Sequence, residues 1–445
     1  MASAAEQLAA HINFQALAKA EELKKRIWFT LAALIVYRLG TFIPIPGIDA
    51  LELARLVQQQ SSGILGFVNS FSGGALGRMA IFALNIMPYI SASIIIQLMT
   101  TVSPHLEQLK KEGEQGRKKI NQYTRYGTVI LAALQAYGIA VGLEAQGNVV
   151  LDPGWFFRFS TVITLTGGTV FLMWLGEQIT QRGVGNGISL IIYAGIVAGL
   201  PMAFAQLLEL GRTGQLSTFT IIGVIVMALA VIAFIVFMER AQRRIIIQYP
   251  KRQQGNRIFQ GETSHLPLKI NTAGVIPPIF ASSLLLLPIT VANFMQGQGP
   301  EWLNVITAML GRGQPLFLLL YAALIIFFTF FYTAIMFDPK EVADNLKKYG
   351  GFIPGIRPGE KTAEYIDYVL TRITFVGAIY LTAVSLLPEI LTSYLRIPFY
   401  FGGTSLLIVV SVTMDTVAQI QGHLLAQQYE GLVKRSRLRG KRKRP

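Results

Sequence analysis

GILGFVNSFSGGALGRMAIFALNIMPYISASIIIQLMTTVS (residues 63–103) begins like a membrane-spanning segment and then stops short of being one. The first apolar run, residues 63–71, has only about half of the roughly 20 residues that a spanning helix needs. Ser72, Gly73 and Gly74 then interrupt it with conformationally free residues. This pattern predicts a short helix that enters the membrane without crossing it; a re-entrant loop that only packs is the alternative.

The second apolar run, residues 79–101, is long enough to span a membrane, but it is not uniformly apolar. It carries Asn85, Pro88, Ser91, Ser93 and Gln97. Polar side chains within a spanning helix face protein or water, because hydrocarbon offers them no hydrogen-bond partner. The run therefore predicts a helix that lines an internal path.

The composition is that of an integral membrane protein. Of 445 residues, 52% are hydrophobic and 14% are charged, which lies outside the range of soluble globular proteins. The sequence has no cysteine, which excludes disulfides, thiol catalysis and thiolate metal sites. Its four histidines lie outside the apolar runs. We expect no metal site and no cofactor.

Apolar runs of about 17 to 24 residues predict ten spanning helices. They lie near residues 27–43, 79–101, 127–143, 160–176, 186–204, 218–238, 272–295, 315–336, 369–388 and 401–421. Of the 39 Lys and Arg residues, 32 fall in the N-terminal arm, the even-numbered loops and the C-terminal tail, and 7 in the odd-numbered loops. This asymmetry predicts cytoplasmic termini. Residues 1–26 are interpreted as an interfacial helix, not a cleavable signal.

Two cytoplasmic loops are longer than a connection requires. Residues 239–269 contain Lys251, Arg252 and the β-branched run 245–247, which predicts a projecting hairpin. Residues 338–367 place Arg357 between Pro-Gly pairs, which predicts an exposed turn tip. We expect partners to bind here; an ordinary positive-inside loop would explain the charge but not the turn residues. The basic run after residue 434 is of a kind that is usually disordered.

Five strings resemble the SecY family, the channel subunits of the bacterial protein-conducting translocon. They are FSGGALGRMAIFALNIMPYISASIIIQL (71–98), RGVGNGISLIIYAGIVAGLP (182–201), LPLKINTAGVIPPIFASS (266–283), GGFIPGIRPGEKTAEYID (350–367) and PFYFGGTSLLIVVSVTMDTVAQIQ (398–421). The resemblance runs in order from about residue 20 to residue 432.

The resemblance implies an all-α integral membrane fold, in which ten transmembrane helices form two pseudo-symmetric five-helix halves around a central pore. The halves would be residues 27–204 and 205–422, between the arm 1–26 and a basic tail 423–445. A short plug helix near residues 63–74 would close the pore from outside, and the pore would also open sideways into lipid.

The resemblance further implies roles for individual residues. The plug would include Phe67, Phe71, Ser72, Gly73 and Gly74. A ring of branched aliphatic side chains, able to exclude water and ions, would be Ile86, Ile90, Ile188, Ile192, Ile279 and Ile408. The lateral gate would include Ser91, Gln97 and Asn271. Contacts with a motor or a ribosome would come from Lys251, Arg252 and Arg357.

Two positions depart from the family pattern. Asn85 stands where the family usually has a small glycine, and a polar side chain beside the ring could loosen its seal. Pro278 follows Pro277 and should sharpen a kink in the seventh helix.

The function implied is a protein-conducting channel in the bacterial plasma (inner) membrane that translocates unfolded secretory polypeptides and releases membrane segments into lipid. The implied partners are SecE and SecG, the SecA motor ATPase, the ribosome with its RNA, signal peptides and nascent chains, and anionic lipids. The alternative, a secondary transporter of small solutes with inverted repeats, usually needs ionisable residues at mid-membrane, and the spans hold almost none besides Asp415. No catalytic motif is present, so we expect no enzyme.

Overall fold

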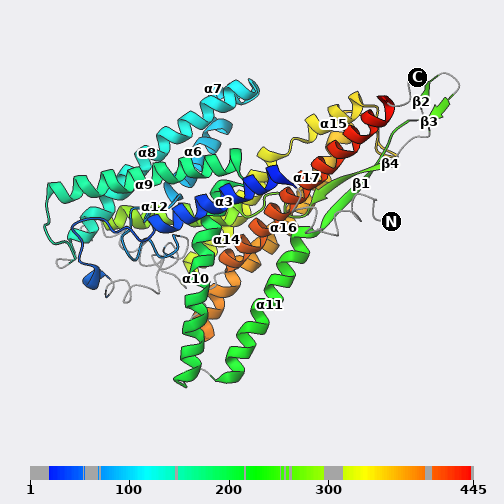
Figure 1. Cartoon of the computed structure of the whole chain (residues 1–445). Coiled ribbons are helices and arrows are strands. Elements are labelled where there is room, and N and C mark those ends of the chain that lie inside the picture. Colours follow the sequence, from blue (N-terminus) through cyan, green and yellow to red (C-terminus); the bar gives the residue numbers. More distant parts are fainter. Residues whose placement is uncertain are drawn as a thin grey trace. The chain divides into compact units, whose positions relative to one another are not determined.

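The computed structural model describes residues 20–53, 55, 69, 72–145, 149–214, 217–250, 252–254, 257–259, 263–294, 314–395 and 403–441 (Figure 1). Its helices are α3 (Glu21–Gly40), α6 (Met87–Val102), α7 (Pro104–Lys111), α8 (Glu114–Glu144), α9 (Trp155–Arg182), α10 (Gly187–Arg212), α11 (Thr218–Arg240), α12 (Ile276–Phe294), α14 (Pro315–Met336), α15 (Pro339–Lys348), α16 (Glu360–Leu395) and α17 (Gly403–Lys441). Its strands are β1 (Gln242–Gln248), β2 (Arg252–Gln254), β3 (Arg257–Phe259) and β4 (Thr263–Lys269).

The chain divides into two compact units. The first contains Met1–Met202, Thr290–Gly299 and Val412–Pro445, and the second contains Ala203–Ile289 and Pro300–Ser411. Helices α10, α12 and α17 pass from one unit to the other.

Each of the ten predicted spans overlaps a described helix. Among the described residues, seven helical stretches are long and apolar enough to cross a membrane, and Met87–Val102 and Ile276–Leu285 are shorter apolar helices. Helix α3 occupies the remaining predicted span. The prediction of a helical protein that crosses the membrane several times is confirmed.

The second span begins later than predicted. Residues 72–86 form successive turns, and the helix begins only at Met87. Met79 and Asn85 have φ angles of 42° and 50°, which an α-helix cannot accommodate. Pro88 lies in the first turn of α6, where its missing N–H has no helical partner to lose. The prediction of a helix from residue 79 is therefore wrong.

The seventh span also begins at its prolines. Pro277 and Pro278 are the second and third residues of α12, which begins at Ile276. Proline bends a helix when it removes an interior hydrogen bond, and in the first turn there is none to remove. These two prolines start the helix instead of interrupting it, and a kink in the seventh helix stays a prediction.

Helices of the first unit pack closely through glycines and aromatic rings. A Cβ on Gly168 of α9 would overlap the carbonyl oxygen of Ile81, so only glycine fits there. The rings of Tyr37, Phe82 and Phe171 stack in succession, with centroid distances of 6.2 and 5.8 Å. These contacts hold the turn segment 72–86 against α3 and α9.

The end of α17 joins the beginning of α3 within the first unit. Leu424 packs in one apolar cluster with Ala20, Leu23 and Val184. The backbone N–H of Gly185 donates to Oε1 of Gln419 at 2.9 Å. The helix then continues to Lys441, so the expectation of a disordered tail is wrong as far as that residue. Residues 422–441 include four leucines, three arginines and two glutamines, which favour helix.

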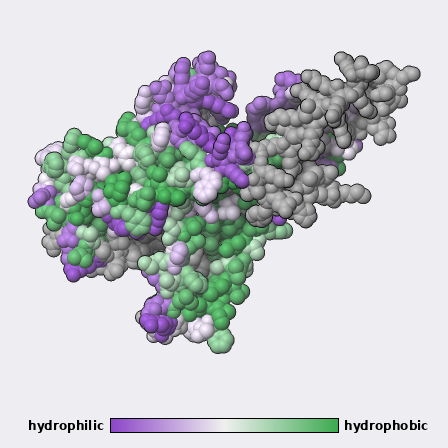
Figure 2. Space-filling view, in the orientation of Figure 1, coloured by the Kyte–Doolittle hydropathy of each residue, from purple (hydrophilic) through white to green (hydrophobic). Residues whose placement is uncertain are grey.

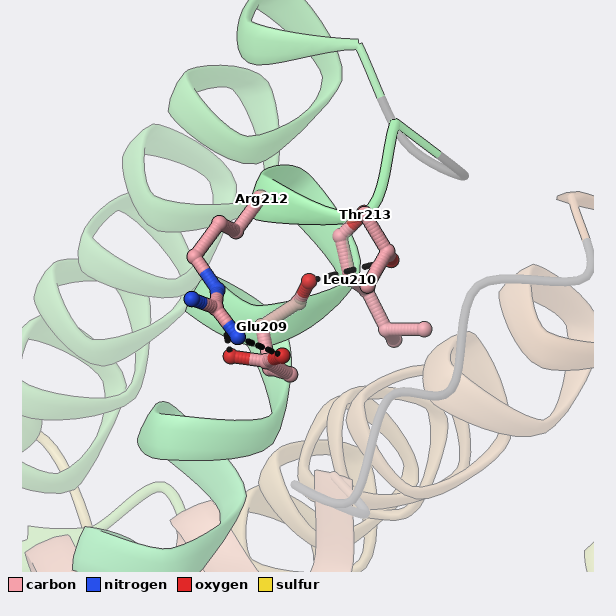
Figure 3. A network of polar contacts seen from close by, with 4 residues as sticks. All are labelled: Glu209, Leu210, Arg212 and Thr213. Carbon is pink, nitrogen blue, oxygen red and sulfur yellow. Dashed lines mark hydrogen bonds and ion pairs between the residues drawn. The ribbon is translucent and has the colours of Figure 1, made fainter.

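In the second unit, the last part of α10 and α11 form a helical hairpin. Its described surface is largely hydrophobic, with a hydrophilic tip (Figure 2). At the tip, Nη2 of Arg212 donates to Oε1 of Glu209 at 2.7 Å, and Oγ1 of Thr213 donates to the carbonyl oxygen of Glu209 at 3.0 Å (Figure 3). These polar groups end α10 at the point where the chain leaves the apolar zone.

Candidate channel site

The end of the predicted plug is a tight turn. Phe67, Phe71 and most of residues 63–74 lie outside the described residues. The hydroxyl of Ser72 donates to the carbonyl of Asn69 at 3.0 Å and accepts from the N–H of Leu76 at 3.2 Å. Gly73 and Gly74 have φ angles of 64° and 83°, which other residues rarely adopt. The glycines that interrupt the apolar run therefore allow this turn.

Two arginines converge on that turn. Nη1 of Arg38 donates to the carbonyl oxygen of Gly73 at 2.8 Å, and Nη2 of Arg78 donates to the same oxygen at 3.0 Å. Both guanidinium groups also lie over the ring of Phe42, with Cζ at 4.7 Å and 4.3 Å from its centroid. Burial and the charge of Arg38 lower the pKa of Arg78.

The turn also abuts α10. A Cβ on Gly73 would lie 3.0 Å from Nη1 of Arg38 and 3.2 Å from both Cα and the carbonyl oxygen of Gly195. Such distances are shorter than normal packing allows. The peptide at Gly73 is thus held between two guanidinium groups and the backbone of α10. The sequence pattern indicated Gly73 and Gly74 as plug residues, but it indicated neither arginine as a site residue.

The six isoleucines predicted to form a pore ring are divided between the two units. Ile86, Ile90, Ile188 and Ile192 belong to the first unit, and Ile279 and Ile408 to the second. All are buried except Ile188, which is half-buried. Ile188 packs on α9, since its Cγ1 lies 3.2 Å from the position of a Cβ on Gly176. The ring itself stays a prediction.

Asn85 lies immediately before the first two of these isoleucines. It is 2% exposed, and its φ angle is 50°. Asparagine adopts this left-handed conformation more readily than most residues, although less readily than glycine. Asparagine in place of the expected glycine therefore preserves the backbone turn that leads into α6.

Two of the three polar residues predicted at the lateral gate, Gln97 and Asn271, have partners within their own unit. Nε2 of Gln97 lies 3.4 Å from the hydroxyl of Ser93, one turn earlier in α6. Asn271 is buried, and its Nδ2 donates to Oε1 of Glu239 at 2.6 Å and to the carbonyl of Gly274 at 3.1 Å. Ser91 is buried. Sequence reasoning missed Glu239, which lies 32 residues from Asn271.

The two long loops of the second unit share one apolar core. Strands β1 and β4 pair antiparallel, with Gln242 opposite Lys269 and Gln248 opposite Thr263, so the predicted hairpin is confirmed. Gln248 also exchanges two backbone hydrogen bonds of 2.9 Å with Phe352 of the other loop. The buried core of the two loops, which together are called the loop module below, consists of Ile245, Leu268, Ile353 and Ile366.

Basic side chains surround this module. Exposed lysines and arginines come from both loops: Arg243, Arg244, Lys269, Lys340, Lys347, Lys348 and Arg357. Arg357 lies in a bend between Gly355 and Gly359, whose φ angles are 81° and 107°, and its carbonyl accepts from Oγ1 of Thr362 at 3.0 Å. Arg252 begins β2, and Lys251 lies outside the described residues.

The fold and these features define a class: a helical protein that crosses the membrane several times, with a broken second span and a basic extramembrane module. The SecY family model matches residues 80–417. The protein translocase subunit SecY of Escherichia coli K12 is 58% identical over 423 residues, covering 94% of this chain and 96% of that protein. The corresponding subunit of Pseudomonas aeruginosa PAO1 is 59% identical over 420 residues, covering 94% and 95%.

Solved structures agree on the fold. A protein-conducting channel matches with a TM-score of 0.65 and 20% identity, over 89% of this chain and 92% of that one. Sec61 from the canine ribosome-channel complex of the endoplasmic reticulum matches with a TM-score of 0.64 and 18% identity, over the same shares.

The chain belongs to the SecY family. It is therefore a multi-pass inner-membrane subunit of a protein-conducting channel and not an enzyme.

Proposed function

We propose that unfolded secretory polypeptides cross the plasma membrane through this chain, and that apolar segments of membrane proteins leave it sideways into lipid. The observation that carries the proposal is the character of the six isoleucines, which are uncharged, branched and buried or half-buried in their own units. An apolar collar can exclude water and ions and still yield around a moving chain.

The proposed channel has two halves, residues 27–204 and 205–422, with the arm 1–26 and the tail 423–445 outside them. A boundary between compact units falls between Met202 and Ala203, close to the proposed junction. Ser91, Gln97 and Asn271 would belong to the seam that opens toward lipid, and residues 63–74 would be the plug. A seam of few polar contacts suits a gate that must open, since each such bond in a membrane contributes about 1 kcal/mol or less.

The termini are proposed to be cytoplasmic. The excess of Lys and Arg in the arm, the tail and the even-numbered loops supports this orientation. The packing of Leu424 with Ala20 and Leu23 supports an even number of crossings, because such a number leaves both ends of the chain on one side.

The driving force is proposed to come from partners that bind the loop module, which would face the cytoplasm. Its basic surface, with Arg252, Arg357 and Lys251 of the same two loops, suits a motor ATPase of the SecA type and the phosphates of ribosomal RNA. Two matched channels, canine Sec61 and the yeast Ssh1 complex, are bound to ribosomes. SecE and SecG are proposed as companion subunits, and signal peptides, nascent chains and anionic lipids as further ligands.

Protease protection tests the proposal. The chain, reconstituted into proteoliposomes with its companion subunits, should make a labelled secretory precursor resistant to added protease when motor and ATP are present. A charge reversal at Arg357 should reduce protection and leave the abundance of the chain unchanged. Precursor that stays fully digestible under all conditions, together with saturable uptake of a small solute, would overturn the proposal.

A further inference from the structure

We propose that Arg38 and Arg78 are positioning residues that latch the end of the plug in the closed channel, with the carbonyl of Gly73 as their common target. This inference rests on the proposed function, because it assigns a role to the segment that the channel uses as its plug. It concerns Arg38, Phe42, Gly73, Arg78 and Gly195, all of which belong to the first unit.

The latch links three separate parts of the chain. Arg38 is in the last turn of α3, Arg78 follows the plug segment, and Gly195 belongs to α10. The two guanidinium groups donate to the oxygen of Gly73 at 2.8 and 3.0 Å. Hydrogen bonds from a charged donor are roughly twice as strong as neutral ones. The peptide at Gly73 therefore cannot leave α10 without breaking two strong contacts.

The arrangement of the two arginines is electrostatically unusual. Within the part of the chain that the structure describes, neither arginine forms an ion pair, and their like charges are close enough for Arg38 to lower the pKa of Arg78. The shared carbonyl oxygen and the face of the Phe42 ring both attract cations. Removing the carbonyl would bring back the repulsion between the arginines, so the arginines and the closed turn stabilise each other.

The backbone is shaped for this contact and for its release. Arg78 also donates from Nε to the carbonyl of Thr41 at 3.2 Å, which keeps its guanidinium in place whether or not Gly73 is bound. Gly73 has no side chain to obstruct its departure, and its φ angle of 64° is accessible to glycine without strain. The latch thus consists of two charge-assisted hydrogen bonds to one carbonyl, at a glycine whose backbone can change conformation without strain.

The test is the ionic conductance of the full-length chain with its companion subunits in planar bilayers, without substrate. Arg38→Met and Arg78→Met keep the aliphatic stem but remove the donors, and each should raise the open probability about tenfold. Arg38→Lys and Arg78→Lys should raise it less, because the charge and one donor nitrogen remain. Phe42→Leu, which keeps both charges, should also raise it.

The controls separate the latch from the plug. Arg55→Met removes an exposed arginine of the same loop, whose partner is Glu52, and should leave conductance unchanged. Deleting residues 63–72 should raise conductance more than any single variant. If the deletion raises conductance and both methionine variants stay at the wild-type level, the latch is overturned and the plug stands. If the deletion itself has no effect, the proposed plug fails and the latch with it.

A double variant tests the shared target. Gly73→Ala places a methyl group against Arg38 and Gly195 and should open the latch by itself. If both changes act on the same contact, Arg38→Met combined with Gly73→Ala should raise conductance no further than the stronger single variant. If the conductance of the double variant instead rises by the product of the two single increases, the residues act independently, and the latch is contradicted.

Discussion

The side-chain amide of Asn271 donates a hydrogen bond of 2.6 Å to Glu239, and this contact ties the segment before α12 to the last turn of α11. Asn271 is 4% exposed. The neighbouring N–H of Ile270 donates to the carbonyl of Ala241 at 3.1 Å. The start of α12, which follows Asn271, is therefore fixed to the base of the hairpin formed by β1 and β4.

Replacing Glu239 by alanine should destabilise the protein by about 1–3 kcal/mol, because the buried amide of Asn271 would lose its charged acceptor. Glu239→Gln retains a side-chain oxygen that can accept, so its effect should be smaller. Thermal unfolding in detergent, followed by helical circular dichroism, measures both. Equal losses for the two variants would show that the contact contributes nothing specific.

Neighbouring isoleucines of β1 should respond very differently to the same change. Ile245 is 5% exposed in the core of the loop module, whereas Ile246 is 49% exposed on the other face of the strand. Ile245→Ala should cost about 2–5 kcal/mol, and Ile246→Ala less than about 1 kcal/mol. Hydrogen exchange should accelerate in β1, β4 and residue 352 for the first variant only. Similar exchange in both variants would argue against a shared core of the two loops.

Two glycines of α10 form another matched pair. A Cβ on Gly187 would overlap the carbonyl of Gly176 in α9, whereas a Cβ on Gly199 would meet nothing within 4 Å. Gly187→Ala should therefore destabilise by about 1–3 kcal/mol through overpacking. Gly199→Ala should be neutral, or stabilising by up to about 1 kcal/mol, because alanine favours helix. Thermal unfolding distinguishes them; the reverse order would refute this packing of α9 against α10.

The first turn of α15 depends on Asp338. Its carboxylate accepts from the N–H of Lys340 at 2.9 Å and of Glu341 at 3.4 Å. Asp338→Ala should cost about 1 kcal/mol, and Asp338→Asn should retain most of the cap. Hydrogen exchange at residues 340–346 reports the change locally. Unchanged exchange in the alanine variant would mean that packing alone holds this helix.

The spans could be predicted because each is a continuous apolar run, and the membrane requires such runs to be helical. The hairpin could also be predicted, because Ile245, Ile246 and Ile247 precede a stretch rich in turn residues. Helix α15 was missed although its signal is present: Asp338, Pro339 and Glu341 occupy the N-cap, first and third positions of a helix start. The Gly and Pro residues that follow it favour turns, and the whole stretch was therefore interpreted as a loop.

The start of α6 could not be read from the sequence, because tertiary contacts decide it. The N–H of Ile45 donates to the carbonyl of Met79 at 2.9 Å, and the N–H of Ile81 donates to the carbonyl of Ile43 at 3.0 Å. Residues 79–81 are as apolar as any span, so the sequence favours a helix there. The short antiparallel pairing with residues 43–45 prevents it. The contacts of Arg38 with Gly73 and of Asn271 with Glu239 join residues 35 and 32 positions apart, which no local pattern specifies.

Site-specific cross-linking tests most directly whether polypeptides pass through this chain. The sequence has no cysteine, so a single introduced cysteine is unique. Variants with cysteine at Ile90, Ile192, Ile279 or Ile408 should each form a disulfide with a cysteine in a precursor stalled during translocation. Leu229 of α11 is 62% exposed on the apolar surface of its unit, and Leu229→Cys is the control. We predict disulfides at the four isoleucine positions and none at residue 229; disulfides at residue 229 alone, or at no position, would contradict a path through the isoleucine ring.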